Sequence, residues 1–87
     1  MRNDVNLRER IDNRQLTVGV IGLGYVGLPL AVELALHGFT VTGFDVAAWK
    51  VGEVNAGRSY IGDLKSEGVA ATVEAGTLRA TTHLWMV

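Results

Sequence analysis

The feature that most constrains this chain is a glycine-rich turn between two apolar runs of different period. Residues 16–21 (LTVGVI) are apolar and rich in β-branched side chains, as in a buried parallel strand. Gly22, Gly24 and Gly27 follow directly. After them, apolar residues recur at helical spacing, at Leu30, Ala31, Leu34 and Ala35. A strand, a G-x-G-x-x-G turn and a helix in this order are typical of a site that binds a phosphate at a helix N-terminus.

Each glycine of such a turn has its own physical role. The first makes the tight turn, the second lets the backbone approach a pyrophosphate, and the third allows the helix to pack closely on the strand. Pro29 is compatible with this helix because it falls in or beside the first turn, where amides have no intrahelical partner. His37-Gly38 provides a helix stop. The alternative is an ordinary strand-to-helix turn without a ligand.

An acidic residue follows the next predicted strand. Residues 39–44 form this strand, and Asp45 stands at its end, where a carboxylate can accept hydrogen bonds from the adenosine ribose hydroxyls. The carboxylate would repel a 2′-phosphate, and residues 46–48 (VAA) offer no arginine to receive one, so NAD is favoured over NADP. FAD remains possible on the glycines alone. Alternatively, Asp45 is only a helix cap or a solvated loop carboxylate.

The remaining pattern continues the alternation of strands and helices. We expect helices at 47–55 and 67–75, ended by Gly57 and Gly76, with Ser66 as N-cap of the second, and a strand at 78–82. Lys50 could bring its ammonium near the adenosine end of a cofactor, or could be a solvated helix lysine. The order β-α-β-α-α-β predicts an α/β chain with a partial Rossmann fold, three-layer with a parallel sheet, over residues 16–87.

Composition excludes several classes of function. The chain has 87 residues, enough for one small domain, and its net charge of −1 gives no electrostatic case for binding nucleic acid or an anionic membrane. It has no cysteine, hence no disulfide, thiolate metal site or cysteine nucleophile of its own. No apolar stretch is long enough for a membrane span and no signal peptide opens the chain, so we expect a cytoplasmic location. Residues 1–15 form a separate polar arm, either a short amphipathic helix or a frayed terminus.

Several segments together resemble the N-terminus of the UDP-glucose/GDP-mannose dehydrogenase family, from about Leu16 to Thr82. They are Gly22 to Ala31 (GLGYVGLPLA), Gly43-Phe44-Asp45, Lys50-Val51, Asn55-Ala56-Gly57, Ser59-Tyr60-Ile61 and Leu78 to Thr82 (LRATT). Within this family, Ser59-Tyr60-Ile61 is similar to the UDP-N-acetylglucosamine 6-dehydrogenase group. A different Rossmann dehydrogenase, such as a hydroxyacid type, is disfavoured by that tripeptide and by Tyr25-Val26.

The resemblance implies two successive NAD-dependent oxidations at C6 of a UDP-sugar, through a thiohemiacetal on a catalytic cysteine, for surface polysaccharide synthesis. It implies cofactor contacts from the glycine turn and from the acid and lysine that follow. These residues are Gly22, Gly24, Tyr25, Val26, Gly27, Asp45 and Lys50. It assigns no metal ligand.

The chain departs from the family in what it lacks. Family members are several times longer, and the catalytic cysteine, its assisting lysine and asparagine and the UDP-binding domain have no counterpart here. Residues 83–87 (HLWMV) also depart from the family's pattern, and His83 has no acid-base partner nearby in the sequence. We therefore expect an NAD-binding N-terminal fragment, inactive alone, whose full-length parent binds the UDP-sugar. The alternative is a non-catalytic dinucleotide- or partner-binding minidomain, which could self-associate through a sheet edge left open after residues 78–82.

Overall fold

The computed structural model describes residues 17–83, which form three strands and three helices. In chain order these are β1 (Thr17–Ile21), α2 (Gly27–Leu36), β2 (Thr40–Phe44), α3 (Ala48–Asn55), α4 (Ser66–Glu74) and β3 (Leu78–Thr81). The predicted order β-α-β-α-α-β is confirmed, with element ends displaced by one or two residues. The predicted arm at residues 1–15 lies outside the described residues.

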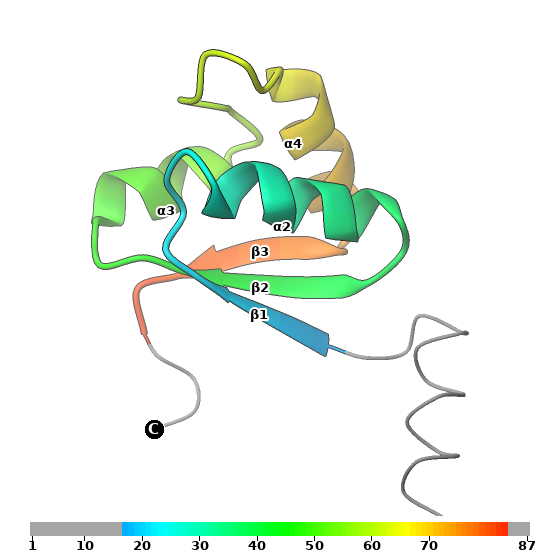
Figure 1. The fold of residues 1–87 in the computed structure, drawn as a ribbon, viewed down its shortest axis with the longest axis horizontal. Helices are drawn as coiled ribbons and strands as arrows, with labels where there is room; N and C mark the ends of the chain where they lie inside the picture. Colours follow the sequence, from blue (N-terminus) through cyan, green and yellow to red (C-terminus); the bar gives the residue numbers. More distant parts are fainter. Residues whose placement is uncertain (1–16, 84–87) are drawn as a thin grey trace, which may run out of the picture.

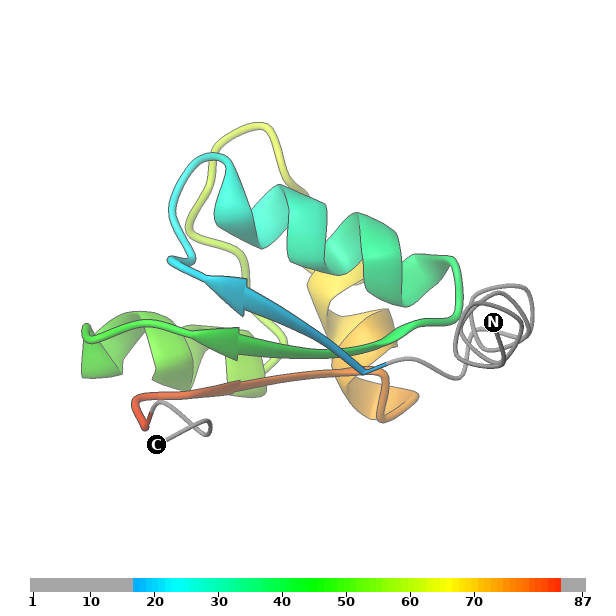
Figure 2. The same ribbon diagram turned by 60° about the horizontal axis from the view of Figure 1, so that its bottom comes forward.

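The strands form one parallel sheet in the order β1-β2-β3. Val20 of β1 pairs with Gly43 of β2, which pairs with Ala80 of β3. All three helices lie on the same face of the sheet (Figures 1 and 2). The described residues therefore supply two of the layers of the predicted three-layer fold, the sheet and one layer of helices.

The core lies between the sheet and these helices. Side chains alternate along the strands, so Val20, Val41 and Leu78 point into the core while Ile21 and Arg79 lie on the other face. The helices contribute the matching apolar positions, which are Leu28, Ala31, Val32 and Ala35 from α2, Val54 from α3 and Val69 from α4. This packing fixes the start of α2 above the end of β1.

The helix ends agree with the sequence analysis except at one cap. Pro29 is the third residue of α2 and thus in its first turn, and Gly38, Gly57 and Gly76 all have positive φ just after the three helices. The prediction that Ser66 is the N-cap of α4 is wrong. Lys65 is the N-cap and Ser66 is the first helical residue, while the Ser66 hydroxyl oxygen accepts a 3.0 Å hydrogen bond from the N–H of Ser59.

The two edges of the sheet differ in how they are covered. On β3, the Asn55 side chain donates to the carbonyl of Ala80 and accepts from its N–H, both at 2.9 Å, as a neighbouring strand would. The predicted open edge at residues 78–82 is therefore partly occupied. At the opposite edge of the sheet, β1 pairs with β2 and with no other strand among residues 17–83.

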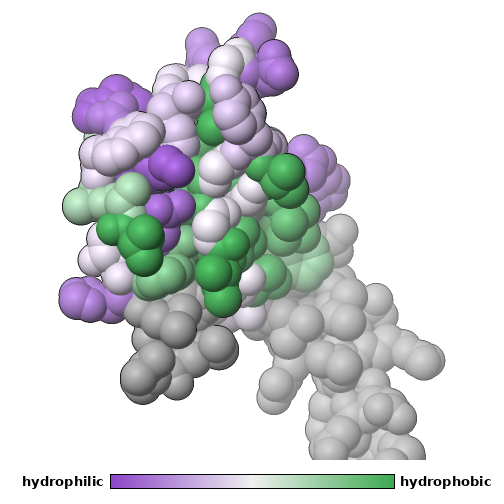
Figure 3. All heavy atoms as spheres, turned by 60° about the vertical axis from the view of Figure 1, so that its left-hand side comes forward, coloured by the Kyte–Doolittle hydropathy of each residue, from purple (hydrophilic) through white to green (hydrophobic). Residues whose placement is uncertain are grey.

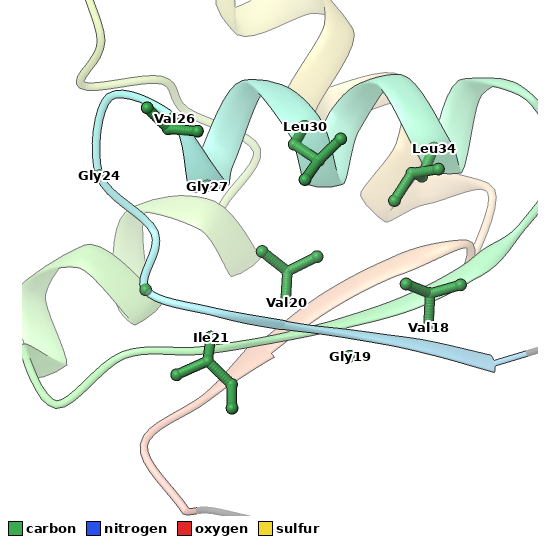
Figure 4. A pocket seen from close by; sticks show the side chains of 10 residues that line it. Val18, Gly19, Val20, Ile21, Gly24, Val26, Gly27, Leu30 and Leu34 are labelled. Atoms are coloured by element: carbon green, nitrogen blue, oxygen red, sulfur yellow. The ribbon is translucent and has the colours of Figure 1, made fainter.

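A groove runs along the free edge of β1, between that strand and α2. It has a volume of about 510 Å³. Val18 and Val20 point from the strand toward Leu30 and Leu34 of the helix, and Ile21 points away to the uncovered face (Figure 4). The glycine turn closes one end of this groove.

Candidate functional site

The glycine turn has the geometry that its first and third glycines predict. Gly22 directly follows β1 and has a φ of +92°, which L side chains rarely adopt, and its N–H donates to the Phe44 carbonyl at 2.8 Å. At Gly27, a Cβ atom would lie 1.6 Å from the Gly22 carbonyl oxygen. Helix α2 thus starts so close to β1 that no side chain fits at position 27.

Gly24 differs because nothing in the described chain requires a glycine there. A Cβ atom at Gly24 would meet no heavy atom within 4 Å, and its φ lies outside the positive range. Neither strain nor packing explains the residue. A ligand approaching the backbone would explain it, and this is the role that the second glycine has in a phosphate-binding turn.

The start of α2 offers backbone N–H groups to such a ligand. Within residues 17–83, the N–H groups of Gly24, Tyr25 and Val26 have no hydrogen-bond acceptor. The N-cap Val26 supplies no side-chain acceptor, and the first turn of α2 contains no acidic residue. The positive end of the helix dipole therefore remains available for an anion.

Asp45 is held beside this turn by two backbone hydrogen bonds. One carboxylate oxygen accepts from the N–H of Leu23 at 2.9 Å and the other from the N–H of Ala47 at 2.8 Å. These bonds, together with the charge of Lys50, lower the pKa of Asp45 against an opposing effect of burial. The carboxylate is therefore ionised at neutral pH, and each oxygen keeps capacity to accept from a further donor such as a hydroxyl.

The other predicted site residues are exposed around this centre. Tyr25 is 83% and Val26 79% exposed, so both are accessible to a ligand at the turn. Lys50 lies on α3 with its Nζ 5.7 Å from the ring centroid of Trp49. Its charge acts on Asp45, so the structure brings it toward the acid. Figure 3, which brings this end of the molecule forward, shows apolar and polar side chains mixed on the surface.

The sequence analysis assigned no role to Tyr60, whose hydroxyl reaches the turn. It donates to the carbonyl oxygen of Leu23 at 2.7 Å. Burial, and secondarily the charge of Asp45, raise the pKa of Tyr60 to about 12, so the hydroxyl is protonated at neutral pH. The signal available in the sequence was an aromatic residue in a glycine-containing loop, and this signal does not reveal the partner of its hydroxyl.

Together, the parallel sheet, the turn with free amides and the ionised acid after β2 define a Rossmann-type dinucleotide-binding domain. Residues 16–86 match the model of the UDP-glucose/GDP-mannose dehydrogenase family, NAD binding domain. The chain belongs to this family, as its sequence resemblance predicted, and NAD is the cofactor of the domain.

Curated relatives of the chain act on several nucleotide sugars. It is 43% identical over 68 residues to an NDP-N-acetyl-D-galactosaminuronic acid dehydrogenase of Ralstonia nicotianae, and 42% identical over 67 residues to a UDP-N-acetyl-D-mannosamine dehydrogenase of Escherichia coli. These matches cover 77% and 76% of this chain but 16% of either relative. A GDP-mannose 6-dehydrogenase of Azotobacter vinelandii is 38% identical over 74 residues, covering 79% of this chain and 16% of the relative.

Solved structures agree with this assignment. The UDP-D-ManNAc dehydrogenase of Pyrococcus horikoshii superposes with a TM-score of 0.74 at 27% identity, over 82% of this chain and 17% of that one. A GDP-mannose dehydrogenase from Pseudomonas aeruginosa, solved as a ternary complex, gives 0.71 at 33% identity, over 77% and 16%. The chain thus matches about a sixth of the length of these relatives.

Residues 17–83 contain neither a cluster of metal ligands nor a helix that could cross a membrane. Histidine, aspartate and glutamate side chains do not gather there in groups of three that could hold a metal ion. None of the described helices combines the length and apolar character needed to cross a membrane.

Proposed function

We propose that this chain binds NAD through Gly22, Gly24, Tyr25, Val26, Gly27, Asp45 and Lys50. The observation that carries the proposal is Gly24, a glycine with neither backbone strain nor a close neighbour, next to amides without partners. The pyrophosphate would accept hydrogen bonds from the N–H groups of the turn. The absence of a side chain at Gly24 would let it come close enough to do so.

Asp45 would hold the adenosine end of the cofactor. Its ionised oxygens, already fixed by two backbone donors, can each accept a hydrogen bond from a ribose hydroxyl. The same negative charge disfavours the 2′-phosphate of NADP. Lys50, close enough to lower the pKa of Asp45, would balance the charge of the acid and contact the adenosine end. The residues present therefore fit NAD.

We further propose that this domain belongs to a UDP-N-acetylhexosamine 6-dehydrogenase. Supporting this are relatives named for N-acetylated hexosamines, such as those that are 43% and 42% identical to the chain. When bound, NAD would supply the hydride acceptor for an oxidation at C6 of the sugar. The chain has no cysteine, so a thiol nucleophile would have to come from polypeptide outside these 87 residues. A cytoplasmic location fits an NAD-dependent protein without cysteine.

Titration of the purified chain with NAD, followed by isothermal calorimetry, tests the binding proposal. The matched variant is Gly24→Ala, whose methyl group has room in the free protein but would stand where the pyrophosphate must approach. We expect saturable NAD binding by the wild type, weaker binding of NADP, and NAD binding weakened by about ten-fold or more in the variant. Equal NAD affinities for the two proteins, or no binding by folded wild type, would refute the proposal.

A further inference from the structure

We propose that Tyr60 is a positioning residue for the cofactor turn, and that its hydroxyl fixes the peptide groups that receive the pyrophosphate. The inference rests on the proposed function and deepens it. Tyr60 lies in the loop between α3 and α4, which passes close to the start of α2 (Figures 1 and 2). Its hydroxyl donates to the Leu23 carbonyl over a distance of 2.7 Å.

The two backbone polar groups of Leu23 are held by two different side chains. Asp45 accepts from its N–H at 2.9 Å, and Tyr60 donates to its carbonyl oxygen. The Leu23 carbonyl belongs to the same peptide group as the N–H of Gly24. Fixing this carbonyl therefore fixes the direction of the first free N–H of the turn, because the peptide group is planar.

The side chain of Leu23 is also fixed, by packing over β2. Leu23 is fully buried, and its Cδ2 atom occupies the space that a Cβ on Gly43 would need, since the two would lie 2.7 Å apart. Its position over β2 is thus set by packing, but packing of an apolar side chain leaves the peptide plane that follows free to rotate. The Tyr60 hydroxyl removes that freedom.

Tyr60 is itself held in place by an aromatic neighbour. Its ring meets that of Trp49 edge to face, with centroids 5.1 Å apart and an interplanar angle of 67°. Trp49 lies on α3 immediately before Lys50 and is 60% exposed. The contact joins the loop after α3 to the helix that carries the predicted adenosine contact, so the turn and α3 are coupled through Tyr60.

The test compares ligands with and without a pyrophosphate. Tyr60→Phe removes the hydroxyl and keeps the ring. We expect NAD and ADP to bind about five-fold more weakly to the variant, as the loss of one neutral hydrogen bond predicts, whereas adenosine, which has no phosphate, binds as to the wild type. Ser59→Ala is the matched control in the same loop, since the Ser59 hydroxyl bonds only to Ile61 among residues 17–83, and its NAD affinity should stay within about two-fold.

The possible outcomes separate this inference from the proposed function. If the wild type binds NAD and Tyr60→Phe binds NAD equally well, the positioning role is wrong while the proposed function stands. An equal loss for NAD and adenosine would mean that Tyr60 only supports the fold, and would also overturn the inference. Failure of folded wild type to bind NAD would overturn the proposed function, and this inference with it.

A second variant keeps the inference testable if Tyr60→Phe does not fold. Placing 3-fluorotyrosine at position 60 preserves the shape of the side chain and makes its phenol more acidic. We expect NADH affinity of this protein to fall as the pH rises through the lowered phenol pKa, because a phenolate cannot donate to the Leu23 carbonyl. Unmodified protein, in which the pKa of Tyr60 is about 12, serves as the control. Parallel pH profiles of the two proteins would contradict the positioning role.

Discussion

The same substitution at two helical glycines should change stability in opposite directions. Gly27 starts α2 and Gly52 lies inside α3. A Cβ atom at Gly52 meets nothing within 4 Å, whereas one at Gly27 lies 1.6 Å from the carbonyl oxygen of Gly22. The structure therefore predicts that alanine is accommodated at position 52 and excluded at position 27.

The magnitude at Gly27 follows from how far the backbone would have to move. Reaching 3.0 Å, below which real Cβ contacts essentially never occur, requires a displacement of at least 1.4 Å from 1.6 Å. The obstacle is the backbone carbonyl of Gly22, not a flexible side chain that could move aside. The N–H of Gly22 also donates to the Phe44 carbonyl, which holds this backbone in place. Overpacking of this kind costs about 3 kcal/mol or more, and the better helix propensity of alanine offsets only about 1 kcal/mol.

For Gly52→Ala, no steric clash opposes the favourable effects of alanine on the free energy of unfolding. Alanine lowers the entropy of the unfolded chain and favours helix, which should stabilise the protein by about 0.5–1 kcal/mol. The net expectation is a loss of about 2 kcal/mol or more for Gly27→Ala and a gain for Gly52→Ala. Since a domain of this size is stabilised by only about 4–13 kcal/mol, either change is measurable, and the first can abolish folding.

Urea unfolding of the three proteins, followed by far-ultraviolet circular dichroism, measures these changes. The slope of the free energy against urea should stay constant for Gly52→Ala, so that its midpoint shift reports stability alone. A Gly27→Ala protein as stable as the wild type would refute the close packing of α2 on β1. A destabilised Gly52→Ala would refute the open surroundings of α3.

Three further measurements follow from the structure. Backbone donors at Leu23 and Ala47 lower the pKa of Asp45 from 3.8, so its ionised form stabilises the fold above the unfolded-state pKa, and this stabilisation is lost as the pH falls through the folded-state pKa. Urea unfolding at a series of acidic pH values should therefore show a steeper loss for wild type than for Asp45→Asn. Asn55→Ala removes both hydrogen bonds to the edge of β3 and should lower the free energy of unfolding by about 1–2 kcal/mol; no change would mean that water replaces the amide. If the β1 edge mediates self-association, Ile21→Lys, at a position 64% exposed, should reduce it in sedimentation velocity runs at matched concentrations, and identical profiles would exclude that edge.

Local patterns in the sequence predicted the elements and the centre of the candidate site. The change of period at Gly22 to Gly27 located the strand, turn and helix, because each glycine answers a separate local requirement. Asp45 was predictable because it ends a short β-branched run at the expected interval after the turn. Such features depend on neighbours in the sequence, and the strands, helices and glycine turn lie where they were predicted.

The cap of α4 and the arrangement of layers depend on distant residues. Ser66 has the residue type of an N-cap, but its hydroxyl oxygen accepts the N–H of Ser59, and no local pattern records that competition. The helices share one face because the strands lie in sequential order, β1-β2-β3. Two crossovers of the same hand that advance in the same direction place their helices on the same side. The sequence predicted the order of elements along the chain, but not the order of strands in space.

The position of Leu23 shows why the site could not be completed from the sequence. Its N–H, carbonyl and side chain meet Asp45, Tyr60 and Gly43, which lie 20 or more residues away along the chain. Only the fold brings these partners together, at the residue preceding the first free amide of the turn. Because Leu23 is already held in the absence of ligand, less conformational entropy is lost when the cofactor binds. The N–H of Leu23 is also one of two backbone donors to Asp45, the other being the N–H of Ala47, so the acid proposed to accept from a ribose hydroxyl is fixed in place before any hydroxyl arrives.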